Sequence, residues 1–275
     1  MRKTINKLFL IITVISALLL TTGCDLFIKT NKGQVDQKWY MGLTYEDDNG
    51  NDTDYTIGTD GTIAAVALED GYGDEFGIIK GEEAYLNINT IIKNIDKRFY
   101  VDATNNLVMF TDATKTYKTK IGGKTINETE NTDYVISFMD GKNCYVNVKF
   151  VKKYVDFDYK VVKAEGKSPA RIVLKYTSGE KNQMTVKSNI EMRTKADYQN
   201  LIVTTLKKNT KVTVLEESGD WTKVGTDDGF MGYVPAKKLK DKETKKTEFK
   251  SDADTYTHVL MNKKISLGWN AITNL

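Results

Sequence analysis

The chain has 275 residues, of which 40% are hydrophobic and 28% are charged, and its formal net charge is +3 at pH 7. So small a charge, with no concentrated basic face, argues against a nucleic-acid partner. Two cysteines and one histidine leave no disulfide framework and no cysteine-based metal site. The length is typical of about two domains with ordinary hydrophobic cores.

Residues 1–23 have the pattern of a secretory signal. A basic head containing Arg2, Lys3 and Lys7 precedes the apolar run from Leu8 to Leu20. As a helix this run would rise only ~20 Å, which is short of the ~30 Å hydrocarbon core of a bilayer. A cleaved signal is therefore favoured over a permanent membrane span.

Cys24 follows directly after this signal, and the whole segment resembles a bacterial lipoprotein signal. The resemblance implies that diacylglycerol is joined to the Cys24 thiol, which predicts an extracytoplasmic protein anchored to the membrane of a Gram-positive bacterium. The signal holds three of the 40 Lys and Arg residues and no carboxylate, so the mature chain carries 37 basic and 37 acidic residues. The alternative is an ordinary signal followed by an unmodified cysteine.

Residues 24–74 are expected to form an N-terminal hairpin region, because Asn49-Gly50 and Asp60-Gly61 are typical hairpin turns. The acidic stretch around the first turn does not fit a calcium loop. Such a loop would need glycine and glutamate where Asp52 and Gly58 stand. No metal ligand is predicted in the chain.

An internal repeat organises the next region. The sequence from Gly81 to Ile88 recurs 60 residues later, from Gly141 to Val148. In both copies an alternating strand pattern changes to helical spacing after an asparagine. Asn87 and Asn147 are therefore predicted to be helix N-caps.

Each predicted helix is followed by two strands, Phe99 to Asp102 and Leu107 to Phe110 in the first copy, and Phe157 to Val162 and Arg171 to Leu174 in the second. Two such strand-helix-hairpin units should pair to bury their helices. They resemble the copper amine oxidase N-terminal-like domain over residues 75–182. The resemblance implies a structural or binding module, and no copper ligand set accompanies it.

Residues 186–240 contain short strands with frequent turns, which is typical of a small β-barrel. The segments Glu191 to Thr194, Gly219 to Val224 and Gly229 to Val234 resemble a bacterial SH3-like domain. Positive φ is expected at both glycines. The resemblance implies targeting to peptidoglycan or a similar cell-wall polymer.

Aromatic faces with polar edges suit sugars and peptides, so five residues of this domain are candidates for a ligand-binding groove. They are Arg193, Tyr198, Asp220, Trp221 and Tyr233. The alternative is that Trp221 and Tyr233 only fill the core of a spacer domain.

Residues 241–254 are charged and almost free of apolar side chains, so they are expected to be an exposed linker. Residues 255–275 contain the apolar run Ile265 to Ile272 and resemble the first barrel strand of glycoside hydrolase family 18, the chitinase-like group. The order of domains is also that of secreted members of this family. The family's Asp-x-x-Asp-x-Asp-x-Glu motif is missing, and a barrel needs ~200 residues or more. No catalytic residue is therefore predicted.

The sequence thus predicts an α+β repeat domain of strand-helix-hairpin units, followed by an all-β SH3-like barrel and a truncated C-terminal segment. The predicted function is that of a lipid-anchored, noncatalytic envelope protein that binds wall polymer without a cofactor. The alternative is the N-terminal targeting half of a family 18 glycoside hydrolase acting on cell-wall or chitin-like polysaccharide. A third hypothesis, a solute-capturing lipoprotein, would need two lobes around a cleft.

Overall fold

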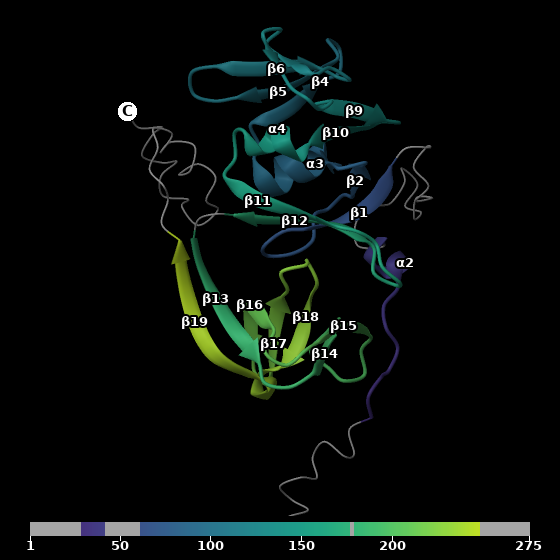
Figure 1. Cartoon of the computed structure of the whole chain (residues 1–275), viewed down its shortest axis with the longest axis vertical. Helices are drawn as coiled ribbons and strands as arrows, with labels where there is room; N and C mark the ends of the chain where they lie inside the picture. The colour runs from purple at the N-terminus through teal and green to yellow at the C-terminus, as the bar shows by residue number, and fades with distance from the viewer. Residues whose placement is uncertain (1–28, 42–60, 177–178, 248–275) are drawn as a thin grey trace, which may run out of the picture.

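The computed structural model describes residues 29–41, 61–176 and 179–247, and its two modules are mostly β-structure (Figure 1). The repeat module comprises residues 61–176. The C-terminal module comprises residues 179–247, with residues 29–41 packed on it. Among the residues described, no helix has the length and hydropathy needed to cross a membrane.

The repeat module is built on a seven-stranded sheet in the order β11-β12-β1-β2-β3-β10-β9. Its strands are β1 (Thr62–Ala67), β2 (Gly77–Lys80), β3 (Glu83–Asn87), β9 (Ser137–Asp140), β10 (Asn143–Asn147), β11 (Phe157–Val162) and β12 (Ala170–Tyr176). The smaller sheets contain β4 (Phe99–Asp102), β5 (Leu107–Thr111), β6 (Thr116–Lys120), β7 (Thr125–Ile126) and β8 (Glu130–Asn131). Its helical segments are α3 (Ile88–Thr90), the π-helical turn η1 (Ile91–Ile95) and α4 (Val148–Lys152).

Strands β3 and β10 relate the two repeats by a local two-fold axis. In this antiparallel pair Leu86 lies opposite Val146, its own equivalent in the second repeat, and Tyr85 lies opposite Asn147. The axis therefore passes between Leu86 and Val146, and it places the two helices on the same face of the sheet (Figure 1). Each repeat covers apolar surface that a single copy would leave exposed.

The predicted N-caps are confirmed. The Oδ1 atom of Asn87 accepts a hydrogen bond from the backbone N–H of Asn89 at 2.8 Å, and that of Asn147 accepts one from Lys149 at 2.9 Å. The hairpin strands after each helix are confirmed as well. The helical segments span only three to five residues each. The fold is therefore mostly β-structure with several sheets, and its assignment to the α+β class remains a prediction.

The core of the repeat module lies between the seven-stranded sheet and the layer formed by the helices and the β4–β6 sheet. Apolar side chains from both repeats meet there, and many of the large ones are fully buried. These are Leu86, Ile91, Phe99, Phe110, Ile126, Ile136, Phe150, Phe157 and Ile172.

Two of the predicted boundaries of this module are wrong. Strand β1 lies between β12 and β2, so the repeat module begins before residue 75, and residues 61–74 are not part of a separate hairpin region. The reason is that Ala64–Ala67 is fully buried and fits a central strand. The turn Asn49-Gly50 lies outside the described residues. At the other end, β13 (Gly179–Val186) belongs to the next sheet, so residues 179–182 are not part of the repeat module.

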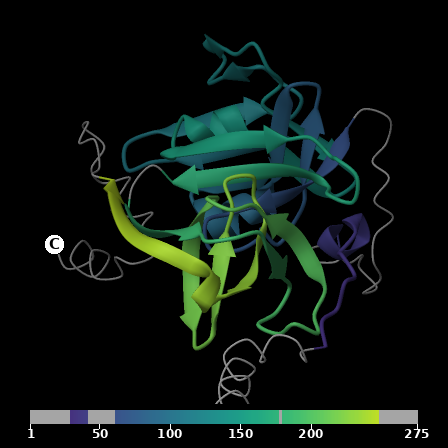
Figure 2. The same ribbon diagram turned by 60° about the horizontal axis from the view of Figure 1, so that its bottom comes forward.

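The C-terminal module is a strongly curved seven-stranded sheet in the order β15-β14-β18-β17-β16-β13-β19 (Figure 2). Its other strands are β14 (Ile190–Arg193), β15 (Ile202–Leu206), β16 (Lys211–Ser218), β17 (Trp221–Gly225), β18 (Met231–Pro235) and β19 (Leu239–Thr247), and the turn η2 covers Ala236–Lys238. Positive φ at Gly219 (56°) and Gly229 (86°) confirms the two predicted glycine turns.

Residues 241–247 were expected in a linker, but they form strand β19. They pair with β13 along its length, from Leu239 opposite Val186 to Thr247 opposite Gly179. The sequence gives no strand signal here because residues 240–246 are exposed and rich in Lys and Glu. Exposed charged residues are common on edge strands. Ion pairs such as Lys242 with Glu217 then fix its charged side chains.

The helix α2 (Gln37–Met41) and the residues before it complete the core of the C-terminal module. Val35 and Tyr40 are only 2% and 1% exposed, and they pack with Val186, Val203 and other residues of the sheet. Residues from opposite ends of the described chain therefore share one core, which no local sequence pattern predicts.

The two modules are joined by a buried contact. The Tyr72 hydroxyl donates to the carbonyl of Gly229 at 3.1 Å and accepts from the N–H of Met231 at 3.2 Å. Arg171 of β12 donates to the carbonyl of Asp228 at 2.6 Å and lies over the Phe230 ring at 4.0 Å. The loop between β17 and β18 is thus covered by the repeat module and is held rigidly against it.

Candidate functional site

Two aromatic side chains of the C-terminal module, Tyr198 and Trp221, form a half-exposed pair. Their ring centroids are 4.8 Å apart and their planes meet at 62°, an edge-to-face arrangement. Trp221 begins β17, where Thr222 and Val224 point into the core, so Trp221 and Lys223 point outward. Tyr198 comes from the loop between β14 and β15. The pair therefore presents an aromatic surface on the outer side of the sheet, at the start of β17.

Tyr233 lies on the same outer face of the sheet. It is opposite Lys223 of β17 and opposite Arg193 of β14, and directly paired residues point to the same side. Tyr233 is half-exposed. It adds a third aromatic ring beside a lysine, and this combination offers both an apolar face and a hydrogen-bond donor to a polar polymer.

Arg193 is only 1% exposed, so it does not line a groove in the way the sequence predicted. Its guanidinium donates to the carbonyl oxygens of Asn31 at 2.8 Å and Asn200 at 2.6 Å, and it forms an ion pair with Glu191. It also lies 5.8 Å from the Tyr198 ring centroid. Arg193 therefore holds the loop that carries Tyr198, because a buried guanidinium needs all these partners.

Asp220, by contrast, is exposed on the turn between β16 and β17. Its backbone carbonyl accepts a hydrogen bond from Ala236 at 2.8 Å. The structure thus brings Tyr198, Trp221 and Tyr233 onto one face, with Asp220 next to Trp221 in the chain. The ligand role of these four residues remains a prediction.

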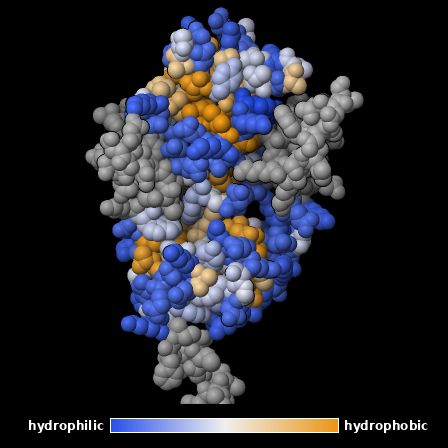
Figure 3. All heavy atoms as spheres, turned by 180° about the vertical axis from the view of Figure 1, so that it is seen from behind, coloured by the Kyte–Doolittle hydropathy of each residue, from blue (hydrophilic) through white to orange (hydrophobic). Residues whose placement is uncertain are grey.

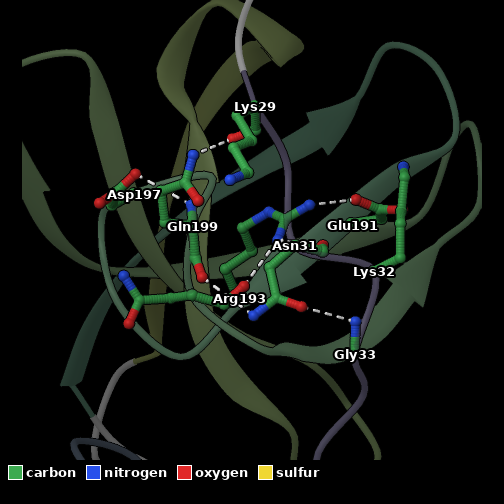
Figure 4. Close-up of polar contacts among 9 residues, drawn as sticks. Lys29, Asn31, Lys32, Gly33, Glu191, Arg193, Asp197 and Gln199 are labelled. Atoms are coloured by element: carbon green, nitrogen blue, oxygen red, sulfur yellow. Dashed lines mark hydrogen bonds and ion pairs between the residues drawn. The ribbon is translucent and has the colours of Figure 1, made fainter.

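Residues 29–35, here named the docked segment, lie along β15 and the loop before it, which carries Tyr198. Figure 4 shows the polar contacts of this segment with Glu191, Arg193 and Gln199. Val35 and Gly33 bond to the backbone of Ile202, the former through its N–H and the latter through its carbonyl, both at 2.8 Å. Sequence reasoning missed this segment. It has neither periodicity nor charge pattern, and Asn31 in a polar stretch gave no local signal.

The polar contacts of the docked segment converge on Asn31. Its N–H donates to the Tyr198 carbonyl at 2.9 Å, and its Nδ2 donates to the Gln199 carbonyl at 3.0 Å. The Gln199 side chain in turn donates to the carbonyl of Lys29. The docked segment is therefore hydrogen-bonded to the Tyr198 loop at two positions, Lys29 and Asn31.

Cys144 does not provide a reactive thiol. It is 2% exposed in β10, and burial raises the pKa of its thiol from 9.0 to about 11.

Cys24 and His258 lie outside the described residues. In the described part of the chain, no three His, Cys, Asp or Glu side chains are grouped in a way that could hold a metal ion. Seen from behind, the surface is mainly hydrophilic, with apolar residues in limited patches (Figure 3).

Comparison with known proteins identifies a single region. Residues 188–240 match the bacterial SH3 domain family, and the match covers β14 to β18 with the aromatic face. No curated protein and no solved structure matches the chain. A bacterial SH3 domain is therefore present in the C-terminal module, and such a domain suggests a cell-wall-binding module.

Proposed function

We propose, from the bacterial SH3 domain at residues 188–240, that this chain is a lipid-anchored and noncatalytic envelope protein that binds peptidoglycan or a similar wall polymer. The observation that carries the proposal is the half-exposed pair Tyr198–Trp221 within that domain. Rigid aromatic faces bind sugars and peptides at low entropic cost, and neighbouring polar groups fix the orientation of the ligand.

The test is cosedimentation of the full chain with purified peptidoglycan sacculi. Replacing Trp221 with Ala should weaken binding by about tenfold or more, because it removes a central aromatic anchor. Tyr100→Ala is the matched control, since Tyr100 is 41% exposed in the repeat module, far from the site. Equal binding by both variants, with unchanged melting temperatures, would remove the assignment of the site.

The lipid anchor has its own test. Cys24→Ser should leave the protein as uncut precursor or in the culture medium, whereas the wild-type chain should fractionate with membranes. Mass spectrometry of the N-terminal peptide should find acyl chains on Cys24. Normal processing and membrane retention of the variant would contradict the anchor.

The targeting half of a family 18 glycoside hydrolase is the second candidate, and the resemblance of residues 255–275 to a barrel strand favours it. An immunoblot of native cells with antibodies to residues 80–240 separates the two. A band near the 31.1 kDa of this sequence supports the noncatalytic protein. A band larger by the mass of a barrel, ~200 residues or more, supports the enzyme.

A further inference from the structure

We infer that the order of the modules in space is the reverse of their order in the chain: the SH3 domain lies at the membrane surface and the repeat module points away from it. The inference rests on the proposed anchor at Cys24. It follows from the position of the docked segment. It also specifies which wall polymer would be bound, namely polymer in the layer next to the membrane.

The docked segment brings the N-terminal end of the described chain to the C-terminal module. Starting from Lys29, residues of this segment bond to the Tyr198 loop and then to β15, and Val35 enters the core. In Figure 1 the purple segment runs from α2 down the side of the C-terminal module, away from the β4–β6 sheet at the opposite end. The repeat module is thus reached only after the chain has passed the SH3 domain.

A buried guanidinium fixes the docked segment in this position. Arg193, at 1% exposure, donates to the carbonyls of both Asn31 and Asn200, so one side chain joins the segment to the loop of the SH3 domain. Loss of either carbonyl would leave a buried charge with an unmet hydrogen bond, which is costly. The contact is therefore part of the fold and not an incidental crossing of two surface segments.

Covalent geometry then limits the distance to the membrane. Lys29 follows Cys24 by five residues, and a fully extended chain spans at most ~3.6 Å per residue, so Lys29 lies within ~18 Å of the anchored sulfur. Since the carbonyl of Lys29 accepts a hydrogen bond from Gln199, the Tyr198 loop is held at about the same distance. This limit holds for any conformation of the connecting residues.

The contact between the modules prevents the repeat module from changing this order. Tyr72 bonds to Gly229 and Met231, and Arg171 bonds to Asp228, so the two modules do not move freely relative to each other. The aromatic face, close to the tether, is consequently offered to polymer in the layer next to the membrane. Polymer in the outer wall would lie nearer to the repeat module.

Energy transfer to labelled lipid tests this order. The full chain, purified from membranes and placed in vesicles containing an acceptor-labelled lipid, carries a donor dye at one cysteine in a Cys144→Ala background. Lys195→Cys places the dye in the loop before β15, and the matched Lys118→Cys places it on β6; both positions are exposed. We expect severalfold more transfer from residue 195 than from residue 118.

A variant of the docked segment adds a second measurement. Asn31→Pro removes the N–H and the amide that bond to Tyr198 and Gln199, so we expect the segment to be released up to Gly33, whose carbonyl still accepts from Ile202. The reach from Cys24 then grows from ~18 Å to ~32 Å. Transfer from residue 195 should fall in this variant. It should be unchanged in Lys32→Ala, which removes only an exposed ion pair with Glu191.

Each outcome decides one point. Equal transfer from the two labels, or more from residue 118, in protein that is bound to vesicles overturns the reversed order while leaving the anchor intact. Protein that does not bind vesicles and has no acyl mass on Cys24 shows that the anchor itself has failed, and the reversed order fails with it. Strong transfer from residue 195 that falls in Asn31→Pro supports the inference.

Discussion

Leu86 and Val146, equivalent residues of the two repeats, lie directly opposite each other in the antiparallel pair β3–β10 of the repeat module's sheet. A pair of this kind requires that the two copies meet through the same surface, as subunits do in a two-fold dimer. The repeat module is therefore a dimer-like arrangement within one chain. At some equivalent positions, however, the two repeats make different contacts.

The two N-caps provide the first such difference. Asn147 donates from its Nδ2 atom to Glu83 at 2.9 Å, whereas the buried Nδ2 of Asn87 has no hydrogen-bond partner among the described residues. Asn87→Ala should cost about 1 kcal/mol of unfolding free energy through the lost cap. Asn147→Ala should cost about 2 kcal/mol, because the bond to Glu83 is lost too. Urea unfolding measures both, and equal costs would contradict the role given to Glu83.

Alanine substitutions at two glycines of the SH3 domain distinguish the cost of backbone strain from the cost of disturbing the contact between the modules. Gly219→Ala should cost about 1 kcal/mol, since φ is 56° but a Cβ atom would enter open space. Gly229→Ala should cost clearly more, because its Cβ atom would lie 2.8 Å from Val173 and 3.0 Å from Ala67 of the repeat module. Thermal unfolding of both variants tests this. Similar melting temperatures would mean that the modules separate easily.

The sequence predicts those parts of the fold that depend on local chemistry. Asparagine caps, glycine turns and alternating strands were found because each rule acts within a few residues, and the strands around Trp221 followed from their turns. The docked segment and β19 could not be found in this way. Their side chains are mostly polar, and their partners, β15 and β13, are far away in the chain, so long-range backbone hydrogen bonds and side-chain contacts place them.

The site shows the same division. The aromatic residues Tyr198, Trp221 and Tyr233 were identified by type and fall on one face. Arg193 was identified for the wrong reason, because its burial depends on the carbonyl of Asn31, 162 residues earlier in the chain. A sequence pattern cannot indicate which arginine will meet a distant carbonyl.

Cys144 should make the stability of the fold depend on alkaline pH. Burial raises the pKa of its thiol from 9.0 to about 11, so the unfolded chain loses this proton first. The contribution to stability is fully present below pH 9 and is lost as pH rises towards 11. Cys144→Ala, which restores the alanine found at residue 84 of the first repeat, should lose less stability between pH 8 and pH 10.5. Unfolding curves at the two pH values measure the difference, and equal losses would show that the thiol ionises freely in the folded protein.

The same burial makes Cys144 a probe of unfolding. At pH 8 a thiol reagent should react with it only in denaturant, since the thiol is 2% exposed and neutral. Rapid labelling of the native chain at this position would contradict the closed core around β10.

The limits of the SH3 domain, finally, can be tested by excision. A fragment of residues 188–240, the region that matches the family, lacks Val186, Val35 and Tyr40, each at most 2% exposed in the core of the C-terminal module. It also lacks β13, which pairs with both β16 and β19. Burying a large apolar side chain contributes about 1.5–3 kcal/mol, so losing three of them is comparable to the whole stability of so small a domain. The fragment 188–240 should therefore be unfolded by circular dichroism. The chain from residue 29 to residue 247 should unfold cooperatively, and a well-folded short fragment would show that the docked segment and β13 are additions to an independent barrel.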